Sequence, residues 1–328
     1  PERGHRWTYA ELDRNTALAA LGLIDLGVRP GDQVVIWGRT SLGWVACFLA
    51  VLRAGGVPVP LNVHYGDHEL AEILGLLEPR LVLASPGTRP LGVSCPLLDL
   101  EGDLAELVRR GQRLAEAELR RRQELQGPEQ LAAMIFTSGT TGLPKGALIA
   151  QGPTLRNLHL VGSRMRFGRR DRLCTSLPLF YAFGCLAALL LPLVRGGTLV
   201  YLENFAPGWF LEALEAERCT ALYAVPTMLV ELLDRPDLDR FDLHRLRTGM
   251  VAGAPCPPEV FKAAMHRLHL PELCGAYGLT EAGPGVSMTC AQDPLPKRLH
   301  TVGRPLEGVS LRIVDPRGGR ELPPGEVG

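Results

Sequence analysis

The sequence has no excess of charge of either sign. Its 328 residues carry 35 basic and 35 acidic side chains. Proteins that bind nucleic acid or anionic membranes through charge show a basic excess, so we expect neither as a main partner. With 46% hydrophobic residues, the chain has too much apolar surface to remain disordered. At roughly 100–200 residues per domain, its length predicts two lobes, or one large lobe plus part of another.

Paired cysteine motifs are also absent. None of the eight cysteines stands in a C-x-x-C pair, and no histidine lies at zinc-ligand spacing from two of them. No apolar segment typical of a signal peptide follows the N-terminus. We therefore expect reduced thiols and a cytoplasmic protein. The first residue is Pro1 and not Met, so we expect a trimmed piece of a longer protein.

One uncharged stretch is long enough to cross a bilayer, and it lies between Arg172 and Arg195. Pro178 and Pro192 interrupt it, and each removes a backbone donor that lipid cannot replace. The pattern favours a strand, a loop and a buried helix over Gly184–Leu193. We expect no integral membrane segment.

Helix and strand patterns alternate along the chain. A capping box of Thr8 and Glu11 opens the first helix. Further helices are predicted at Trp44–Arg53, Pro207–Glu217, Thr227–Asp234 and Pro257–Leu268. Strands are predicted at Gln33–Trp37, Val57–Val59, Leu81–Ala84, Ala132–Phe136, Thr198–Leu202, Thr220–Val225, Arg247–Ala252 and Leu273–Tyr277. This alternation predicts an α/β fold, with parallel sheets covered by helices on both faces.

Two segments depart from this alternation. Asp103 to Gln126 predicts one charged helix, with leucines 104, 107, 114 and 125 on a partly buried face. Glutamates interleave its arginines, which favours a solvated bridging helix over a basic binding patch. Beyond Gly303 the pattern changes, and Ser310–Val314 alternates as a half-exposed strand. We expect a core domain over 1–302 and the start of a small antiparallel β-barrel subdomain over 303–328.

The most informative segment is the loop that follows the strand ending at Phe136. It places four hydroxyl side chains, glycines and a lysine together, which is how proteins hold polyphosphate. It is not a Walker A loop, because Pro144 precedes the lysine and Gly146 follows it. The candidate phosphate-binding residues are Thr137, Ser138, Gly139, Thr140, Thr141, Gly142 and Lys145.

This loop resembles the signature of the adenylate-forming superfamily, which contains acyl- and aryl-CoA synthetases, luciferases and peptide-synthetase adenylation domains. Further segments carry the resemblance in family order. They are residues 52–62 for the first core motif, 253–255 for the adenine loop, 277–281 for the Y-G-x-T-E motif, and 302–305 with 324–328 for the next segment.

The resemblance implies a reaction in two halves. A carboxylate attacks the α-phosphate of ATP to give an acyl-adenylate and pyrophosphate, and coenzyme A then takes the acyl group. Lys145 would act as a point charge on the leaving phosphates, and Thr280 would bind the α-phosphate. Glu281 would hold Mg²⁺. The adenine site implied by the resemblance consists of Gly253, Ala254, Pro255 and Tyr277.

The segment Leu177 to Gly184 aligns with the motif that lines the acyl pocket in the family. The implied substrate-binding residues are Tyr181, Phe183, Gly184, Gly278 and Leu279. Many acyl-CoA synthetases have His where this chain has Tyr181, which cannot carry positive charge near neutral pH. Amino-acid-activating relatives place an Asp beside Phe183, and none is present here. Residues 249–259 look most like medium-chain fatty acyl-CoA synthetases, which favours a fatty acid.

Two alternatives stay open: an aryl acid–CoA ligase acting on an o-succinylbenzoate-like precursor, and a module that binds acyl-adenylate without ligating it. Relatives continue with a T-G-D segment, a hinge and a small C-terminal domain that brings a catalytic lysine. None of these occurs before Gly328. We therefore expect the printed chain to bind nucleotide and acid but to turn over poorly. The sequence leaves two further alternatives: the acyl acceptor is coenzyme A or a carrier protein, and the protein is a monomer or a homodimer.

Overall fold

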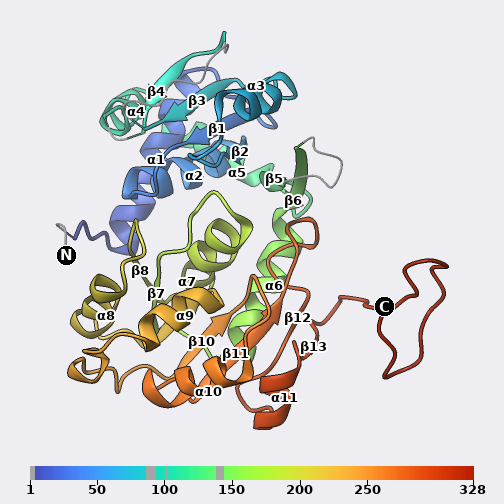
Figure 1. Ribbon diagram of the computed structural model, residues 1–328. Coiled ribbons are helices and arrows are strands. Elements are labelled where there is room, and N and C mark those ends of the chain that lie inside the picture. The colour runs from blue at the N-terminus through green and yellow to red at the C-terminus, as the bar shows by residue number, and fades with distance from the viewer. Residues whose placement is uncertain (1–3, 86–93, 101, 138–143) are drawn as a thin grey trace.

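The computed structural model describes residues 4–85, 94–100, 102–137 and 144–328. Figure 1 shows an N-terminal lobe above a larger second lobe. The N-terminal lobe contains α1 (Tyr9–Asp25), β1 (Gln33–Trp37), α2 (Leu42–Ala54), β2 (Val57–Pro60), α3 (Asp67–Gly75), β3 (Leu81–Ala84), β4 (Leu97–Asp99), α4 (Leu104–Gly111) and α5 (Glu116–Glu124). A hairpin of β5 (Leu131–Thr137) and β6 (Lys145–Ala150) follows it.

The second lobe holds the remaining elements. They are α6 (Gln151–Arg164), β7 (Arg172–Thr175), η1 (Phe183–Leu189), α7 (Leu190–Arg195), β8 (Thr198–Tyr201), α8 (Pro207–Ala216), β9 (Ala221–Ala224), α9 (Pro226–Leu233), η2 (Leu238–Arg240), β10 (Thr248–Val251), α10 (Pro258–Arg267), β11 (Glu272–Tyr277), η3 (Thr280–Ala282), β12 (Ser287–Met288), α11 (Leu295–His300) and β13 (Arg304–Pro305).

The first sheet is parallel and buried on both faces. Its order is β2-β1-β3-β4. Successive side chains of a strand point to opposite faces. Val34 and Ile36 accordingly join the core under α1 and α2, while Val35 and Trp37 join a separate core under α3. Burial on both faces explains why β1 is apolar at every position after Gln33.

The second sheet has the order β13-β12-β11-β10-β9-β7-β8. The strands from β7 to β11 run parallel, and β12 and β13 add an antiparallel edge. Helices α8, α9 and α10 pack together, and α6 packs against α7. The predicted α/β class with helix-covered parallel sheets is confirmed. The eight strands predicted from this alternation all form, with their ends shifted by at most a residue or two.

The prediction of one helix from Asp103 to Gln126 is wrong. The chain forms α4 and α5, separated by a turn at residues 112–115. The break resets the helical period, so Leu119 is buried while Leu125 is 75% exposed. Neither helix is a solvated bridge, since Leu107 is buried and Arg122 donates to the carbonyls of Val28 and Ala54.

A close approach of α4 to α1 fixes this arrangement. A Cβ added at Gly111 would lie 1.9 Å from the carbonyl oxygen of Leu18. We expect Gly111→Ala to lower the free energy of unfolding by about 2 kcal/mol, because the helices would have to separate. Gly75→Ala is the control: its Cβ would meet open space at the end of α3. Denaturant unfolding should show that variant unchanged or slightly more stable. Equal losses in both variants would contradict the packing argument.

The buried helix of the second lobe begins differently from its prediction. Over Phe183–Leu189 it is a π-helix, η1, which continues as α7. Pro192 has no N–H for the carbonyl of Ala188, so a regular α-helix across this point would lose a hydrogen bond and place the proline ring against that carbonyl. The π-helix, a rare form with wider turns, directly precedes the turn that contains Pro192. In the described part of the chain, no helix is long and apolar enough to cross a membrane.

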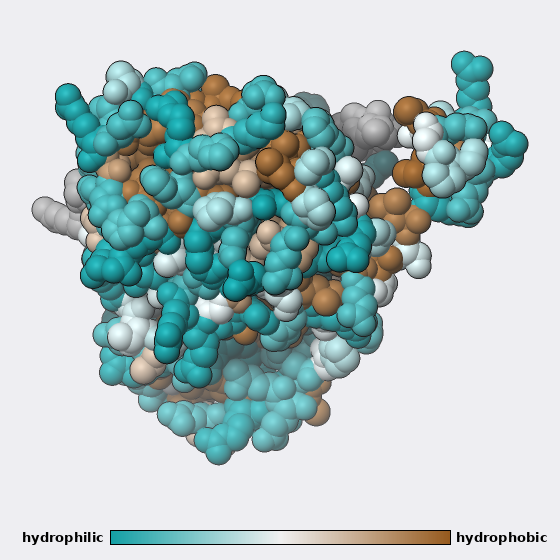
Figure 2. Space-filling view, turned by 90° about the horizontal axis from the view of Figure 1, so that it is seen from below, coloured by the Kyte–Doolittle hydropathy of each residue, from teal (hydrophilic) through white to brown (hydrophobic). Residues whose placement is uncertain are grey.

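The C-terminal residues project from the second lobe (Figures 1 and 2). Of the predicted strand Ser310–Val314, only Val314 has a ladder partner, in one antiparallel bridge to Glu321. The projecting segment has few neighbours to pair with, and Leu311 and Ile313 are nearly half exposed. The small antiparallel element predicted near the C-terminal end is confirmed: it consists of the antiparallel strands β12 and β13 and this bridge. The domain boundary at residue 302 stays a prediction.

Candidate functional site

The carboxyl ends of the parallel strands meet at one cavity of about 620 Å³. Its lining includes residues that follow β1, β7, β8, β9 and β10 within one to three positions. In order, these are Arg39 and Thr40, Ser176, Glu203, Val225 and Gly253. Open α/β sheets bind their ligands at this edge, where loops from different strands converge. The topology therefore places a binding cavity between the two lobes.

Three of the predicted acid-pocket residues line this cavity: Tyr181, Phe183 and Gly184. Phe183 packs against the ring of Tyr223, with centroids 5.6 Å apart. A Cβ on Gly184 would lie 2.0 Å from the carbonyl oxygen of Pro178, so only glycine lets the π-helix approach this loop. The structure thus fixes the aromatic wall of the cavity through a backbone contact.

Gly278 and Leu279, the other two predicted acid-pocket residues, do not line this cavity. They lie exposed in the turn between β11 and η3. Their place at the acid pocket stays a prediction.

Two contacts join the lobes beside this cavity. Nδ2 of Asn62 lies 3.3 Å from the phenol oxygen of Tyr181. Nη1 of Arg39 lies 4.0 Å from Oε1 of Glu203. The sequence patterns did not single out these residues as functional, although Asn62 lies in the quoted first core motif. The available signal was their position, because polar residues directly after buried parallel strands lie at the ligand-binding edge.

The phosphate-loop residues that the structure describes lie beside the Y-G-x-T-E motif. The Oγ1 of Thr137 donates to Oε1 of Glu281 at 3.2 Å. Lys145 is exposed and stands opposite Thr137 in the β5–β6 ladder. Two segments far apart in the sequence thus bring a hydroxyl and a carboxylate into contact, with Lys145 on the strand beside them. The predicted residues Ser138, Gly139, Thr140, Thr141 and Gly142 lie outside the described residues.

The predicted adenine site lies at the same sheet edge. β10 and β11 are parallel neighbours, and Gly253 and Tyr277 stand at their carboxyl ends. Gly253 has a φ of +89°, which favours glycine. Ala254 and Pro255 are exposed in the same loop. Tyr277 is 43% exposed, so its ring has a free face on which a flat base could stack.

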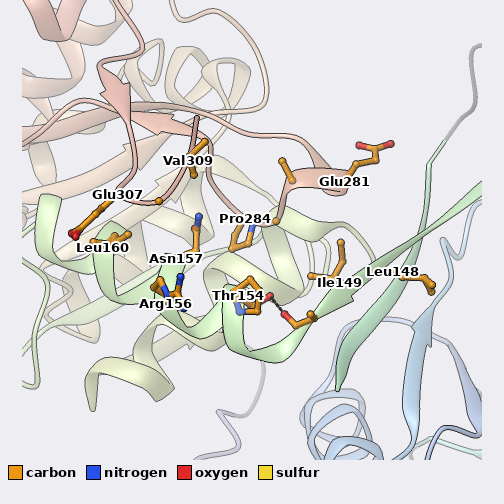
Figure 3. Close-up of a pocket in the computed structure, with 15 residues that line it drawn as sticks. Leu148, Ile149, Thr154, Arg156, Asn157, Leu160, Glu281, Pro284, Glu307 and Val309 are labelled. Atoms are coloured by element: carbon orange, nitrogen blue, oxygen red, sulfur yellow. Dashed lines mark hydrogen bonds between the residues drawn. The ribbon is translucent and has the colours of Figure 1, made fainter. Parts of the chain in front are cut away.

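Glu281 also stands at one end of a second cavity, of about 360 Å³, between β6, α6, η3 and residues 307–309 (Figure 3). Figure 3 places it on the opposite side from Glu307. Asn157 on α6 donates through Nδ2 to the carbonyl of Gly285 at 2.6 Å. This buried contact anchors the segment that carries Glu281 to the long helix behind it.

The acidic residues limit which metals the site can hold. Among the described residues, no three His, Cys, Asp or Glu side chains gather as a metal cluster. A structural zinc site needs about four such ligands, whereas Mg²⁺ is commonly held by one or two carboxylates plus phosphate oxygens. Glu281, with Thr137 beside it, fits a magnesium ion that arrives with a nucleotide.

Cysteine chemistry does not fit this site. Cys185, the neighbour of Gly184, is buried, and burial raises the pKa of its thiol to about 12. It is therefore a neutral thiol near pH 7 and a poor nucleophile. This thiol is therefore not a nucleophile for a ligand in the cavity.

Known proteins resemble the chain over its whole length. The AMP-binding enzyme family matches residues 2–328. A putative acyl-CoA synthetase, YngI of Bacillus subtilis, is 33% identical over 100% of this chain and 66% of its own length. The mitochondrial medium-chain acyl-CoA ligase ACSF2 of Bos taurus is 31% identical over 94% of this chain and 57% of its own.

A solved structure has the same architecture. The crystal structure of ATP-bound MatB from Rhodopseudomonas palustris superposes with a TM-score of 0.85 at 29% identity, covering 98% of this chain and 64% of that one. The chain thus spans less than two thirds of the length of each of these relatives.

Proposed function

The chain belongs to the AMP-binding enzyme family, and we propose that the whole protein is an AMP-forming, ATP-dependent acid–CoA ligase. The observation that carries the proposal is the contact of Thr137 with Glu281, which joins the phosphate loop to the Y-G-x-T-E motif. The names of its relatives, acyl-CoA synthetase and acyl-CoA ligase, agree with this activity.

The chemical difficulty of the first half-reaction is that one anion must attack another. Catalysis must therefore come from positioning and from neutralising charge. We propose that Lys145 and the loop residues Thr137 to Gly142 hold the phosphates that leave as pyrophosphate. Thr280 would donate a hydrogen bond to the α-phosphate. Glu281 would hold Mg²⁺, which supplies positive charge to the phosphate oxygens when it is bound.

We propose that the adenine lies against the β10 and β11 edge. Tyr277 would stack on the base, and the loop of Gly253, Ala254 and Pro255 would contact it along its rim. The half-exposed ring of Tyr277 and the left-handed backbone at Gly253 support this assignment. The site then lies between the phosphate-binding hairpin and the cavity lined by Tyr181.

We further propose that the acid is a fatty acid and that the second substrate is coenzyme A. Apolar and aromatic side chains dominate the deep part of the cavity, including Phe183, Val225 and Met228. The segment between Arg172 and Arg195 has no Asp to pair with a substrate ammonium, and Glu203, which also lines the cavity, faces Arg39. A cavity of about 620 Å³ has room for an alkyl chain of medium length. The eight free cysteines support a cytoplasmic location.

Calorimetry with non-hydrolysable acyl-adenylate analogues tests the acid. We expect affinity to rise about fourfold per methylene, the effect of burying about 0.8 kcal/mol each, until the cavity is full. A plateau at medium length supports a fatty acid. A profile that is flat from two to sixteen carbons would contradict the fatty acid and favour an aryl acid. AMP is the control ligand, because it reports the nucleotide site alone.

A further inference from the structure

Two contacts hold Asn62 in one orientation after β2. Its Oδ1 accepts a hydrogen bond from the backbone N–H of His64 at 2.9 Å. Its backbone carbonyl accepts one from Nε1 of Trp37 at 3.2 Å. A backbone N–H can only donate, so the amide oxygen of Asn62 must be the atom that faces His64. The amide NH₂ group must then face the other way.

The group that this NH₂ faces is the phenol of Tyr181. Nδ2 lies 3.3 Å from the phenol oxygen. An amide NH₂ has hydrogens to donate and no lone pair with which to accept, so the oxygen of Tyr181 is the acceptor in this pair. The hydrogen of the phenol is therefore not used by Asn62, and it remains available for another partner.

The phenol is placed where such a partner would be a ligand. Tyr181 lines the larger cavity and is 49% exposed. Its ring meets Phe180 edge-on, with centroids 4.7 Å apart at 63°, and Phe180 meets the His64 ring edge-on at 6.3 Å. These contacts restrict the orientation of the Tyr181 ring. The main remaining freedom of the hydroxyl is rotation of its O–H bond, which sets the direction of the hydrogen.

We infer that Asn62 is a positioning residue that sets the hydrogen-bond polarity of Tyr181, so that the phenol O–H donates to an acyl oxygen of the bound acid or adenylate. This inference rests on the proposed function, because it needs an acyl oxygen in the cavity. A neutral O–H donor to a carboxylate oxygen makes a short, charge-assisted bond without a positive charge. The pair thus supplies a donor at the position where many acyl-CoA synthetases have His.

A double-mutant cycle tests the coupling. The variants are Asn62→Ala, Tyr181→Phe and the combination, and the probe is a non-hydrolysable decanoyl-adenylate analogue measured by calorimetry. We expect Tyr181→Phe to weaken binding about tenfold, the scale of one lost hydrogen bond to a charged or strongly polar group. Asn62→Ala should weaken analogue binding about three- to fivefold, because the O–H bond of Tyr181 is then no longer oriented by the Asn62 amide. The double variant should bind as Tyr181→Phe does.

AMP separates this role from a structural one. AMP lacks the acyl oxygen, so its affinity should not change in any of the three variants. Asn62→Asp is a second probe: it keeps the acceptor for His64 but presents an oxygen to the phenol, and should weaken analogue binding more than Asn62→Ala does. The inference would be overturned if Asn62→Ala weakened analogue binding equally with and without the Tyr181 hydroxyl, or did not weaken it at all. Failure of the proposed function looks different, since the unmodified protein would then bind AMP but no acyl-adenylate analogue.

Discussion

Replacing Glu281 by glutamine is expected to slow acyl-adenylate formation by about 100- to 1000-fold, the usual loss when one preorganised group that stabilises transition-state charge is removed. Glu281→Gln keeps the shape of the side chain and its contact with Thr137 but removes the charge that would hold Mg²⁺. The measurement is single-turnover formation of acyl-adenylate from ATP and decanoate, followed across a magnesium titration.

Glu307→Gln is the matched control for this variant. Glu307 lines the same small cavity as Glu281, at its opposite side, and has no part in the proposed reaction (Figure 3). We expect its rate to stay within about twofold of the unmodified protein, as for most surface substitutions. Equal loss in both variants would mean that general negative charge at this cavity, and not a magnesium ligand at residue 281, supports the reaction.

The second large effect is expected at Gly184, where the chain has no room for a side chain. A Cβ there would lie 2.0 Å from the oxygen and 2.7 Å from the carbon of the Pro178 carbonyl. We expect Gly184→Ala to lower the free energy of unfolding by about 3 kcal/mol, because the π-helix must move away from the loop. Binding of the acyl-adenylate analogue should be lost as well, since Tyr181 and Phe183 lie on the two displaced segments.

Gly168→Ala is the control, because a Cβ at Gly168 would meet no atom within 4 Å. Thermal unfolding and analogue binding should both stay close to those of the unmodified protein. Retention of full stability and binding in Gly184→Ala would show that the close approach to Pro178 does not shape the cavity.

The strands and the sheet class were predictable because a strand that is buried on both faces needs apolar residues at consecutive positions. Residues 34–37 of β1 form an apolar run because the two faces of the strand enter two cores. The break between α4 and α5 was not predictable in the same way. It depends on the contact of Gly111 with Leu18, which lies far away in the sequence and leaves no periodic signal. The π-helix at Phe183–Leu189 is a similar case, since its residues also suit an α-helix.

For the site, the motifs predicted which segments gather but not how they touch. Thr137 and Glu281 came from two separate motifs, and the structure places them in direct contact. Gly278 and Leu279 were expected at the acid pocket but lie outside the larger cavity. The sequence did not predict a role for Asn62, Arg39 or Glu203, because a single polar residue after a strand belongs to no motif or periodic pattern. Only the parallel topology shows that they share an edge.

The most direct test of the account is product analysis with the whole protein, from which this chain comes, in excess over ATP, with Mg²⁺, decanoate and coenzyme A. AMP-forming ligation predicts AMP and pyrophosphate in equal amounts, dependent on the acid, with decanoyl-CoA formed when coenzyme A is present. Release of ADP and phosphate, or acid-independent hydrolysis of ATP, would contradict the assignment of Lys145, Thr280 and Glu281 to adenylate formation.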